Sequence, residues 1–438
     1  GIAVKVLVLL GSGMAGESFP GLDGRTFLEA ADTPAMDRLA AVGVSGGWHS
    51  APASAQSSPG ADTTLYELCG CFKRTPRGPL EALGSGIGLR EGEVAFRANF
   101  VCLRPGATSV IMFDSAGGGI SDEEGEALSA HLRENFLPDP GEEIGFHSLG
   151  GYRALLTYRK QGDEVSPAAL CGFMPPHDIE GQPIGDYLPP SGEARRFVHI
   201  VNDSQMIMAG YQGTKQGTES AMFPANSIWL WGGGAVSDHP PISQALGGRR
   251  AAFVSNCPAV IGVGRLGGAE VFSTGGAMSA ADCRPEMVAA ARRAARSSDF
   301  VVVCDEGPAE AVNRGKNSGE IVGAIEAFDR EVAGPLIEEM GEGDWRILLL
   351  ADCIASNRPA PWAMADWNSG ELRPPLFKEG FGFAALLRRL RGEGEASAGV
   401  ETSPRGGASP EAGAFVESLC ENRAPLTGRA LLKRLLAA

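Results

Sequence analysis

The stretch that decides the fold is residues 4–13, VKVLVLLGSG, a nearly continuous apolar run that ends in Gly11-Ser12-Gly13. Continuous apolar runs are typical of central parallel strands, because helices cover both faces of such a strand. The glycines predict a tight turn at the carboxyl end of the strand, where doubly wound proteins place their chemistry. The run lacks a charged leading segment, so we expect a buried strand and not a signal peptide.

Similar runs recur in the second half of the chain and alternate with predicted helices. Residues 35–42 are expected to form the first helix, with Thr33 as N-cap and Pro34 at the first helical position. Later apolar runs lie at 251–255, 260–263, 300–304 and 346–350, and later helices are predicted at 285–297, 321–340 and 429–436. This alternation predicts an α/β fold with a doubly wound sheet.

The middle of the chain, residues 76–248, has a different pattern. Short strands are predicted at 94–103, 109–113, 152–158 and 227–231, and helices at 122–136, with Ser121 as N-cap, and within 193–210. We therefore expect an inserted α+β domain at 76–248 and a discontinuous core domain made of 1–75 and 249–438. Residues 392–413 are rich in Gly, Ser, Ala and Glu and predict a surface loop.

Composition narrows the class of function. The 438 residues carry 38 Lys and Arg against 53 Asp and Glu, a formal charge of −15. Such an acidic chain is not expected to bind nucleic acid or an anionic membrane, and no apolar run approaches the ~18 residues of a membrane-spanning helix. Nine cysteines, an odd number, do not predict a disulfide framework. We expect a soluble cytoplasmic protein, and the sequence does not predict its oligomeric state.

The loops after the predicted strands carry distinctive motifs. These are GSGMA (11–15), ADTPAMDRL (31–39), PGAD (59–62), RGPLEA (77–82), VAFRAN (94–99), PPHDIEG (175–181), PANSIWLWG (224–232), GVGRL (262–266), PAEAVN (308–313) and ADC (351–353). Together and in this order, they resemble the archaeal-type cofactor-independent phosphoglycerate mutases of the alkaline-phosphatase superfamily. The resemblance extends from Val6 to about Asp352. It implies an alkaline-phosphatase-like sheet with an inserted substrate domain.

The resemblance also implies a chemistry that this chain departs from. The family uses two divalent metal ions (manganese, zinc or magnesium), bound by Asp and His at strand ends, to activate a serine that carries the phosphoryl group. The family motifs GDG, PGSD, PDEAxH and DH supply the metal ligands and that serine. At the matching positions this chain has Ser12 for Asp, Ala61 for the nucleophilic Ser, Ala309 for Asp, Asn313 for His, the retained Asp352, and Cys353 for His.

The histidine count supports the same conclusion. The family's last metal histidine belongs to a His-Thr-x-Asp-Pro motif, but residues 357–367, NRPAPWAMADW, contain none. The histidines of the chain are His49, His131, His147, His177, His199 and His239, so the 199 residues after His239 have none. We therefore predict no catalytic residue, no metal ligand and no cofactor at these positions.

Some residues near this site allow alternatives. Ser12 is either a displaced nucleophile or a small residue in the turn, and we favour the latter because no histidine of the second half can act as its base. Cys353 and the Cys69-x-Cys71 pair are either reactive thiols or buried apolar residues, which is the usual role of cysteine. Lys316, three residues after Asn313, offers a positive charge for the position of a lost metal.

The resemblance further implies five substrate-binding residues: Arg97, His177, Asp178, Arg265 and Arg77. Guanidinium groups bind phosphate and carboxylate through paired hydrogen bonds. The alternative is that these side chains brace loops. We favour the ligand for Arg97 and the brace for Arg265, which we expect in a glycine-rich turn.

Two classes of function remain open. In the first, the chain is a pseudoenzyme whose cleft binds a small anionic metabolite or a partner protein. In the second, it is an enzyme of altered, metal-independent chemistry on a phosphorylated or carboxylated metabolite, or retains residual interconversion of 2- and 3-phosphoglycerate. The fold alone does not choose between them.

Overall fold

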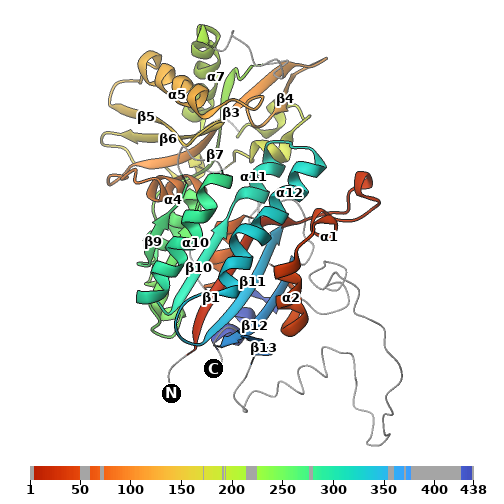
Figure 1. Ribbon diagram of the computed structural model, residues 1–438. Coiled ribbons are helices and arrows are strands. Elements are labelled where there is room, and N and C mark those ends of the chain that lie inside the picture. The colour runs from red at the N-terminus through yellow and green to blue at the C-terminus, as the bar shows by residue number, and fades with distance from the viewer. Residues whose placement is uncertain are drawn as a thin grey trace, which may run out of the picture.

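The computed structural model describes residues 4–49, 60–69, 74–170, 172–189, 192, 194–213, 224–275, 280–353, 360–368, 371–375 and 426–436. Their strands form two sheets, which define a large-sheet unit and a small-sheet unit (Figure 1). The predicted surface loop at 392–413 lies outside the described residues. No described helix combines the length and the apolar character that crossing a membrane requires.

The large sheet has nine described strands in the order β14-β2-β12-β11-β1-β10-β8-β9, with β13 beside β12. They are β1 (Lys5–Ala15), β2 (Val44–His49), β8 (Ala251–Ser255), β9 (Glu270–Ser273), β10 (Phe300–Asp305), β11 (Trp345–Cys353), β12 (Ala360–Asn368), β13 (Glu371–Arg373) and β14 (Leu426–Thr427). Strand β1 lies between β10 and β11 and is parallel to both, whereas β12 is antiparallel to β11 and β2. The predicted α/β fold with a mostly parallel central sheet is confirmed.

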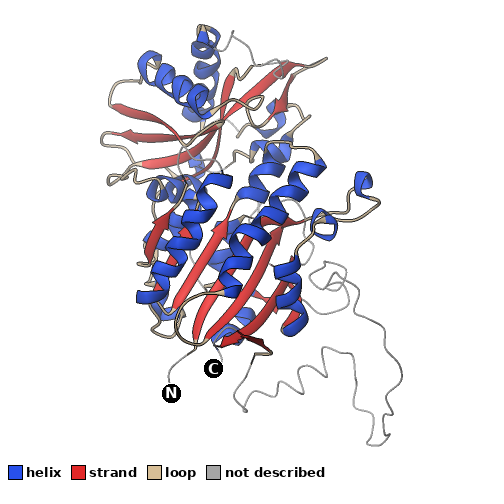
Figure 2. Cartoon of the chain, in the orientation of Figure 1, coloured by secondary structure: helices blue, strands red, loops and turns tan. Residues whose placement is uncertain are grey.

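Helices pack around the large sheet and against one another (Figure 2). They are α1 (Phe27–Ala30), α2 (Pro34–Val42), α3 (Ala61–Leu68), α9 (Pro258–Leu266), α10 (Ala280–Ser297), α11 (Gly307–Asn313), α12 (Ser318–Phe328), α13 (Gly334–Glu338) and α15 (Gly428–Leu436). The apolar run at 260–263 belongs to α9. The helix predicted at 321–340 is made of α12, a π-helical segment and α13.

The start of α2 is capped differently from the prediction. Thr33 is at the N-cap position, but its hydroxyl donates to Asp37 (3.2 Å) and caps no backbone group. The backbone N–H groups of Ala35 and Met36 donate instead to the carboxylate of Asp329, at 3.2 and 2.8 Å. Asp329 begins the π-helical segment Asp329–Ala333, so a tertiary contact replaces the local cap.

The small sheet is antiparallel and lies at one end of the large-sheet unit (Figure 1). Its described strands, in the order β4-β3-β6-β5 with β7 beside β3, are β3 (Val94–Pro105), β4 (Val110–Asp114), β5 (Glu142–Ser148), β6 (Arg153–Lys160) and β7 (Ser227–Gly234). Its longer helices are α5 (Asp122–Asn135) and α7 (Arg195–Ala209), and Ser121 forms the predicted N-cap of α5. All five strands fall within 76–248, and the exact domain boundaries stay a prediction.

Helix α4 (Arg77–Gly84) connects the two units, because it packs against β3 and β7 on one side and α9 on the other. Glycines allow its backbone to approach α9 closely. A β-carbon at Gly262 would lie 2.0 Å from the backbone oxygen of Leu80, and one at Gly84 would lie 1.7 Å from that of Pro258. The two helices would have to move apart to accept a methyl group at either position.

We expect Gly262→Ala to destabilise the protein by about 1–3 kcal/mol, because the added methyl group overpacks the α4–α9 contact. Gly323→Ala is the matched control: Gly323 lies inside α12 with no atom within 4 Å of the new methyl group. Alanine should stabilise that helix by up to about 1 kcal/mol. Chemical denaturation of the two variants measures both effects. Equal unfolding free energies would contradict the close packing of α4 and α9.

Candidate functional site

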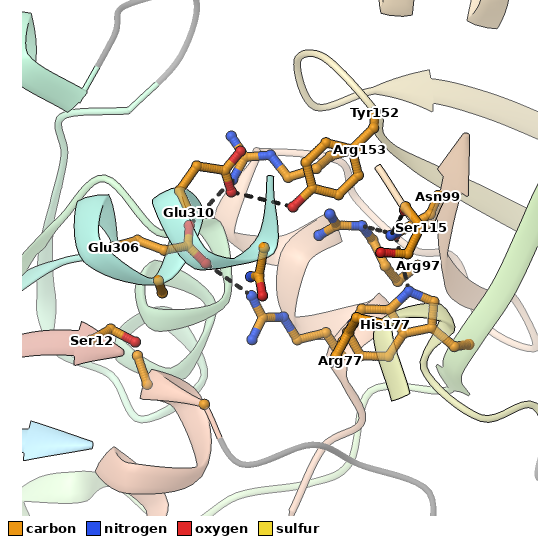
Figure 3. Close-up of a pocket in the computed structure, with 15 residues that line it drawn as sticks. Ser12, Arg77, Arg97, Asn99, Ser115, Tyr152, Arg153, His177, Glu306 and Glu310 are labelled. Atoms are coloured by element: carbon orange, nitrogen blue, oxygen red, sulfur yellow. Dashed lines mark hydrogen bonds and ion pairs between the residues drawn. The ribbon is translucent and has the colours of Figure 1, made fainter. Parts of the chain in front are cut away.

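A pocket opens between the carboxyl ends of the parallel strands and the small sheet (Figure 3). Its cavity volume, measured as the space open to the centre of a water molecule, is about 50 Å³, within about 650 Å³ of unfilled space that includes open solvent. Its lining comes from both units: Ser12, Gly60, Ala61, Arg77, Arg97, Asn99, Ser115, Tyr152, Arg153, His177, Trp231, Glu306, Ala309, Glu310 and Asn313. A concave, partly polar pocket at this edge of an α/β sheet is the expected place for a binding site.

Strand β1 continues beyond the expected turn and presents Ser12 to this pocket. Gly11-Ser12-Gly13 is an irregular part of the strand, where the register with β11 shifts between Gly11 and Ala15. Gly13 has φ of 78°, a left-handed conformation that favours glycine. The predicted turn is therefore wrong. Gly13 instead allows strand β1 to bend and continue to Ala15.

Asp352, near the end of β11, is buried beneath the pocket and surrounded by donors. Its carboxylate accepts hydrogen bonds from the backbone N–H of Gly13 (2.5 Å), the hydroxyl of Thr64 (3.2 Å) and the hydroxyl of Ser12 (3.3 Å to each oxygen). Burial raises the pKa of Asp352 to about 6 despite these three donors, and the nearby charge of Asp62 adds to the rise.

The other positions matched to family ligands gather in the same place. Ala61 begins α3, and Ala309 and Asn313 lie on α11; all three line the pocket with Ser12. Cys353 ends β11, and the structure does not describe its side chain. Within the described residues, no three His, Cys, Asp or Glu side chains are grouped so that they could hold a metal ion.

A buried polar cluster fixes the turn that leads into α11. The carboxylate of Asp305 accepts from Arg284 (2.8 Å), Asn256 (2.8 Å) and the backbone N–H of Gly307 (2.9 Å). Asn256 in turn accepts a hydrogen bond from the backbone N–H of Glu306 (2.8 Å). These bonds hold the residues after β10 in a defined position at the pocket wall.

Arg97, on β3, lines the pocket, and hydrogen bonds to neighbouring side chains hold its guanidinium group in place. Its Nη1 donates to both carboxylate oxygens of Glu81, at 2.7 and 2.6 Å, and its Nε donates to Asn99 at 3.1 Å. Its Nη2 has no hydrogen-bond acceptor in the described part of the chain. Burial alone would raise the pKa of Glu81, but the charges and hydrogen bonds of Arg97 and Arg77 outweigh it and lower this pKa to about 2.

Arg77, the first residue of α4, joins several acids at the pocket wall. Its Nε donates to Glu81 (2.6 Å), its Nη1 to Asp62 (2.9 Å) and its Nη2 to Glu306 (3.2 Å). These partners come from α4, α3 and the turn before α11. The predicted pocket position of Arg77 is therefore observed, and its role toward a ligand stays a prediction.

His177 lines the pocket with its ring 5.6 Å from that of Trp231. Burial lowers the pKa of His177, and the charges of Arg77 and Arg97 add to this effect while Asp178 opposes it. The imidazole is therefore harder to protonate than a free one.

Three other candidates lie outside the pocket lining. Asp178 follows His177 in the sequence but does not line the pocket. Arg265 lies in the last turn of α9, not in a glycine-rich turn as expected, and donates to the backbone carbonyl of Leu83. Lys316 pairs with Glu320 (3.3 Å) on the surface and does not replace a metal charge.

Several lining residues were absent from the predicted set. Arg153, at the start of β6, lies 3.2 Å from Glu306 and 3.8 Å from Glu310, and the hydroxyl of Tyr152 donates to Glu310 at 3.3 Å (Figure 3). Gly60, Asn99, Ser115 and Trp231 are the remaining lining residues outside the predicted set. Glu306 and Glu310 could have been found from their position just after the predicted strand at 300–304. The others became neighbours only through tertiary folding.

Comparisons with known proteins show the family of this chain. A sequence model described as 2,3-bisphosphoglycerate-independent phosphoglycerate mutase matches residues 40–210. A Geobacter sulfurreducens protein named "Probable 2,3-bisphosphoglycerate-independent phosphoglycerate mutase" is 35% identical over 356 residues, which cover 80% of this chain and 86% of that protein. The chain belongs to this phosphoglycerate mutase family.

Two further relatives support the assignment. The 2,3-bisphosphoglycerate-independent phosphoglycerate mutase of Methanothrix thermoacetophila is 35% identical over 376 residues, 83% of this chain and 91% of that protein. The structure of the PH0037 protein from Pyrococcus horikoshii aligns with a TM-score of 0.54 at 18% identity, over 91% of this chain and 100% of that chain. The structural similarity shows a shared fold. The family resemblance seen in the sequence motifs is confirmed.

The raised pKa of Asp352 makes stability depend on pH. A carboxyl whose pKa is about 6 in the folded protein, against 3.8 ordinarily, binds its proton more tightly when folded. Stability from this group is therefore fully present below about pH 4 and is lost as pH rises through 6, by roughly 3 kcal/mol in total. Asp352→Asn should remove this part of the pH dependence.

Denaturant unfolding of wild type and Asp352→Asn between pH 4.5 and 8 measures the difference. Asp344→Asn, at an exposed carboxylate just before β11, is the control and should keep the wild-type profile. Parallel profiles for wild type and Asp352→Asn would show that Asp352 does not titrate in this range.

Proposed function

We propose that this member of the phosphoglycerate mutase family binds a small anionic metabolite in the pocket and does not interconvert 2- and 3-phosphoglycerate. The observation that carries the proposal is the contrast between the two ends of the pocket. At the small-sheet end, Arg97 Nη2 has no hydrogen-bond acceptor among the described residues, and burial lowers the pKa of His177 in the same lining. At the large-sheet end, Ala61 and Ala309 present methyl groups where the family has a nucleophile and a metal ligand.

The donor set around Asp352 does not fit two divalent cations. A divalent cation takes four or more oxygen, nitrogen or sulfur ligands, whereas the neighbours of Asp352 are N–H and hydroxyl donors already bonded to it. Near them, Asn313 offers only an amide, and Asp62 is paired with Arg77. These contacts support the view that the family's dinuclear centre and its phosphoryl transfer are absent from this chain.

The Ser12–Asp352 contact favours a second candidate, metal-independent chemistry with Ser12 as nucleophile. A carboxylate beside a hydroxyl is the arrangement of a base and its nucleophile. Against this, the 3.3 Å contact is long for a hydroxyl donor, and Gly13 and Thr64 already occupy the same carboxylate. Binding without chemistry remains our proposal.

Two cysteines favour a reducing compartment. Cys257 and Cys304 are buried and form no disulfide bond. Disulfides are typical of proteins in oxidising compartments and rare in cytosolic ones. We propose a cytoplasmic location on this ground.

The first test of the proposed function is catalytic. The purified protein, supplied with manganese, should show no interconversion of 2- and 3-phosphoglycerate above background and should retain less than about 0.2 equivalents of metal. A cation requires four or more ligands, and the described residues contain no group of His, Cys, Asp or Glu side chains that could hold one. Ala61→Ser alone should not restore activity, since a serine without a neighbouring metal or base is a poor nucleophile. Measurable turnover by the unmodified protein would contradict the proposal.

The second test concerns binding. A thermal-shift screen of phosphorylated and carboxylated metabolites, starting with 3-phosphoglycerate, identifies a ligand that raises the melting temperature. Arg97→Lys keeps the positive charge beside Glu81 and removes the forked donor, so it should weaken binding of that ligand by about 1.5–3 kcal/mol in calorimetry.

Arg265→Lys is the matched control, because Arg265 lies outside the pocket. It should leave the affinity unchanged. Equal losses in the two variants, or a screen with no stabilising anion, would refute anion binding at Arg97.

A further inference from the structure

Glu306 joins the two units of the molecule inside the pocket. It precedes α11 of the large-sheet unit, and its Oε1 accepts from Arg77 Nη2 at 3.2 Å while its Oε2 accepts from Arg153 Nη1 at 3.2 Å. Figure 3 shows its carboxylate between the two guanidinium groups. An anionic ligand held by two arginines would place its oxygens in the same way.

The bond lengths distinguish Glu306 from Glu81. Hydrogen bonds between guanidinium and carboxylate are typically about 2.7–2.9 Å long. The bonds of Glu81 to Arg97, 2.6 and 2.7 Å, lie at or just below the short end of this range, and the Glu81 side chain is 1% exposed. Both bonds of Glu306 are 3.2 Å, and its side chain is 13% exposed. Glu81 is thus a fixed structural partner, whereas Glu306 is held loosely.

Arg153 is incompletely satisfied by this arrangement. Its Nε is buried and has no hydrogen-bond partner among the described residues. Buried donors in folded proteins are nearly always bonded. Glu306 therefore meets only part of the hydrogen-bonding capacity of Arg153.

The charges of the pocket already balance without a ligand. Four arginines face four acids in the connected network: Arg77, Arg97, Arg153 and Arg314 against Asp62, Glu81, Glu306 and Glu310. An incoming anion finds no surplus positive charge unless one carboxylate withdraws. Glu310 has a close partner of its own in Arg314 (2.6 Å) and Asp62 one in Arg77 (2.9 Å), so Glu306 is the acid with the weakest contacts.

We propose that Glu306 is an internal competitor for an anion subsite formed by Arg77 and Arg153, and that it sets the affinity of the pocket for anions. The inference rests on the proposed function, since it concerns the same pocket and the same class of ligand. A phosphate or carboxylate group takes over the bonds to the two arginines, and the Glu306 side chain moves towards solvent. Glu306 thereby restricts the pocket to ligands that bind these arginines better than a tethered carboxylate.

The test uses inorganic phosphate as the probe and the whole chain. Calorimetry at fixed ionic strength should show phosphate binding at least tenfold tighter to Glu306→Gln than to wild type, because the amide carries no competing charge. Arg153→Met added to Glu306→Gln should remove the gain. Glu342→Gln, an exposed residue outside the pocket lining, makes the same change in net charge and should bind as wild type does.

Three results would overturn the inference: equal phosphate affinity of Glu306→Gln and wild type, an equal gain in Glu342→Gln, or a gain that survives Arg153→Met. Its failure is distinct from failure of the proposed function, which depends on Arg97 and a metabolite screen of the unmodified protein. Circular dichroism checks the fold of each variant. If Glu306→Gln does not fold, Glu306→Asp, which has a shorter reach, is measured in its place with the same expected direction.

Discussion

The parallel pairing of β1 with β10 on one side and β11 on the other is the constraint on which the site depends. The register places Gly11 beside both Asp305 and Ala351, so the carboxyl ends of β1, β10 and β11 lie at one edge of the sheet. Segments some 300 residues apart in the sequence thereby contribute Ser12, Asp352 and the start of α11 to a single pocket. These strands are apolar and almost completely buried. The backbone geometry at this edge of the sheet therefore depends little on which side chains the edge carries.

The chemistry of this edge is therefore decided by local contacts and not by the fold. At this edge, the buried carboxylate of Asp352 is compensated by hydrogen bonds from Gly13, Thr64 and Ser12. Hydrogen bonds to a buried carboxylate lower the cost of its charge but do not remove it, which is why its pKa stays raised.

Much of the fold followed from the sequence because it is locally encoded. Apolar runs predicted β1, β8, β10 and β11, although a similar run at 260–263 lies in α9, and the Ser121 cap predicted the start of α5. Strands such as β5 and β12 were missed, because their short or mixed patterns become strands only when paired with a neighbour. The cap of α2 was wrong for the same reason, since the acid that caps it comes from residue 329.

The site was predicted in part, and the limit has a physical cause. Motifs indicated which chain segments converge, and Arg77, Arg97 and His177 do line the pocket. The motifs did not predict that Arg265 would lie in the last turn of α9, or that Arg153 would form an ion pair with Glu306. Ion pairs between separate units arise from tertiary packing, which local patterns do not encode.

Brace and ligand donor, the two roles that the sequence leaves open for Arg97, are physically compatible. A guanidinium has five N–H donors in a rigid plane. Glu81 and Asn99 engage Nη1 and Nε, whereas Nη2 has no hydrogen-bond acceptor among the described residues. Removing a buried partner such as Glu81 costs about 3–5 kcal/mol in comparable ion pairs, so these contacts fix the plane firmly. A donor held in place before a ligand arrives loses little entropy on binding. Under the proposed anion binding, the strength of Nη2 as a donor would therefore depend on the same ion pair that stabilises the pocket wall.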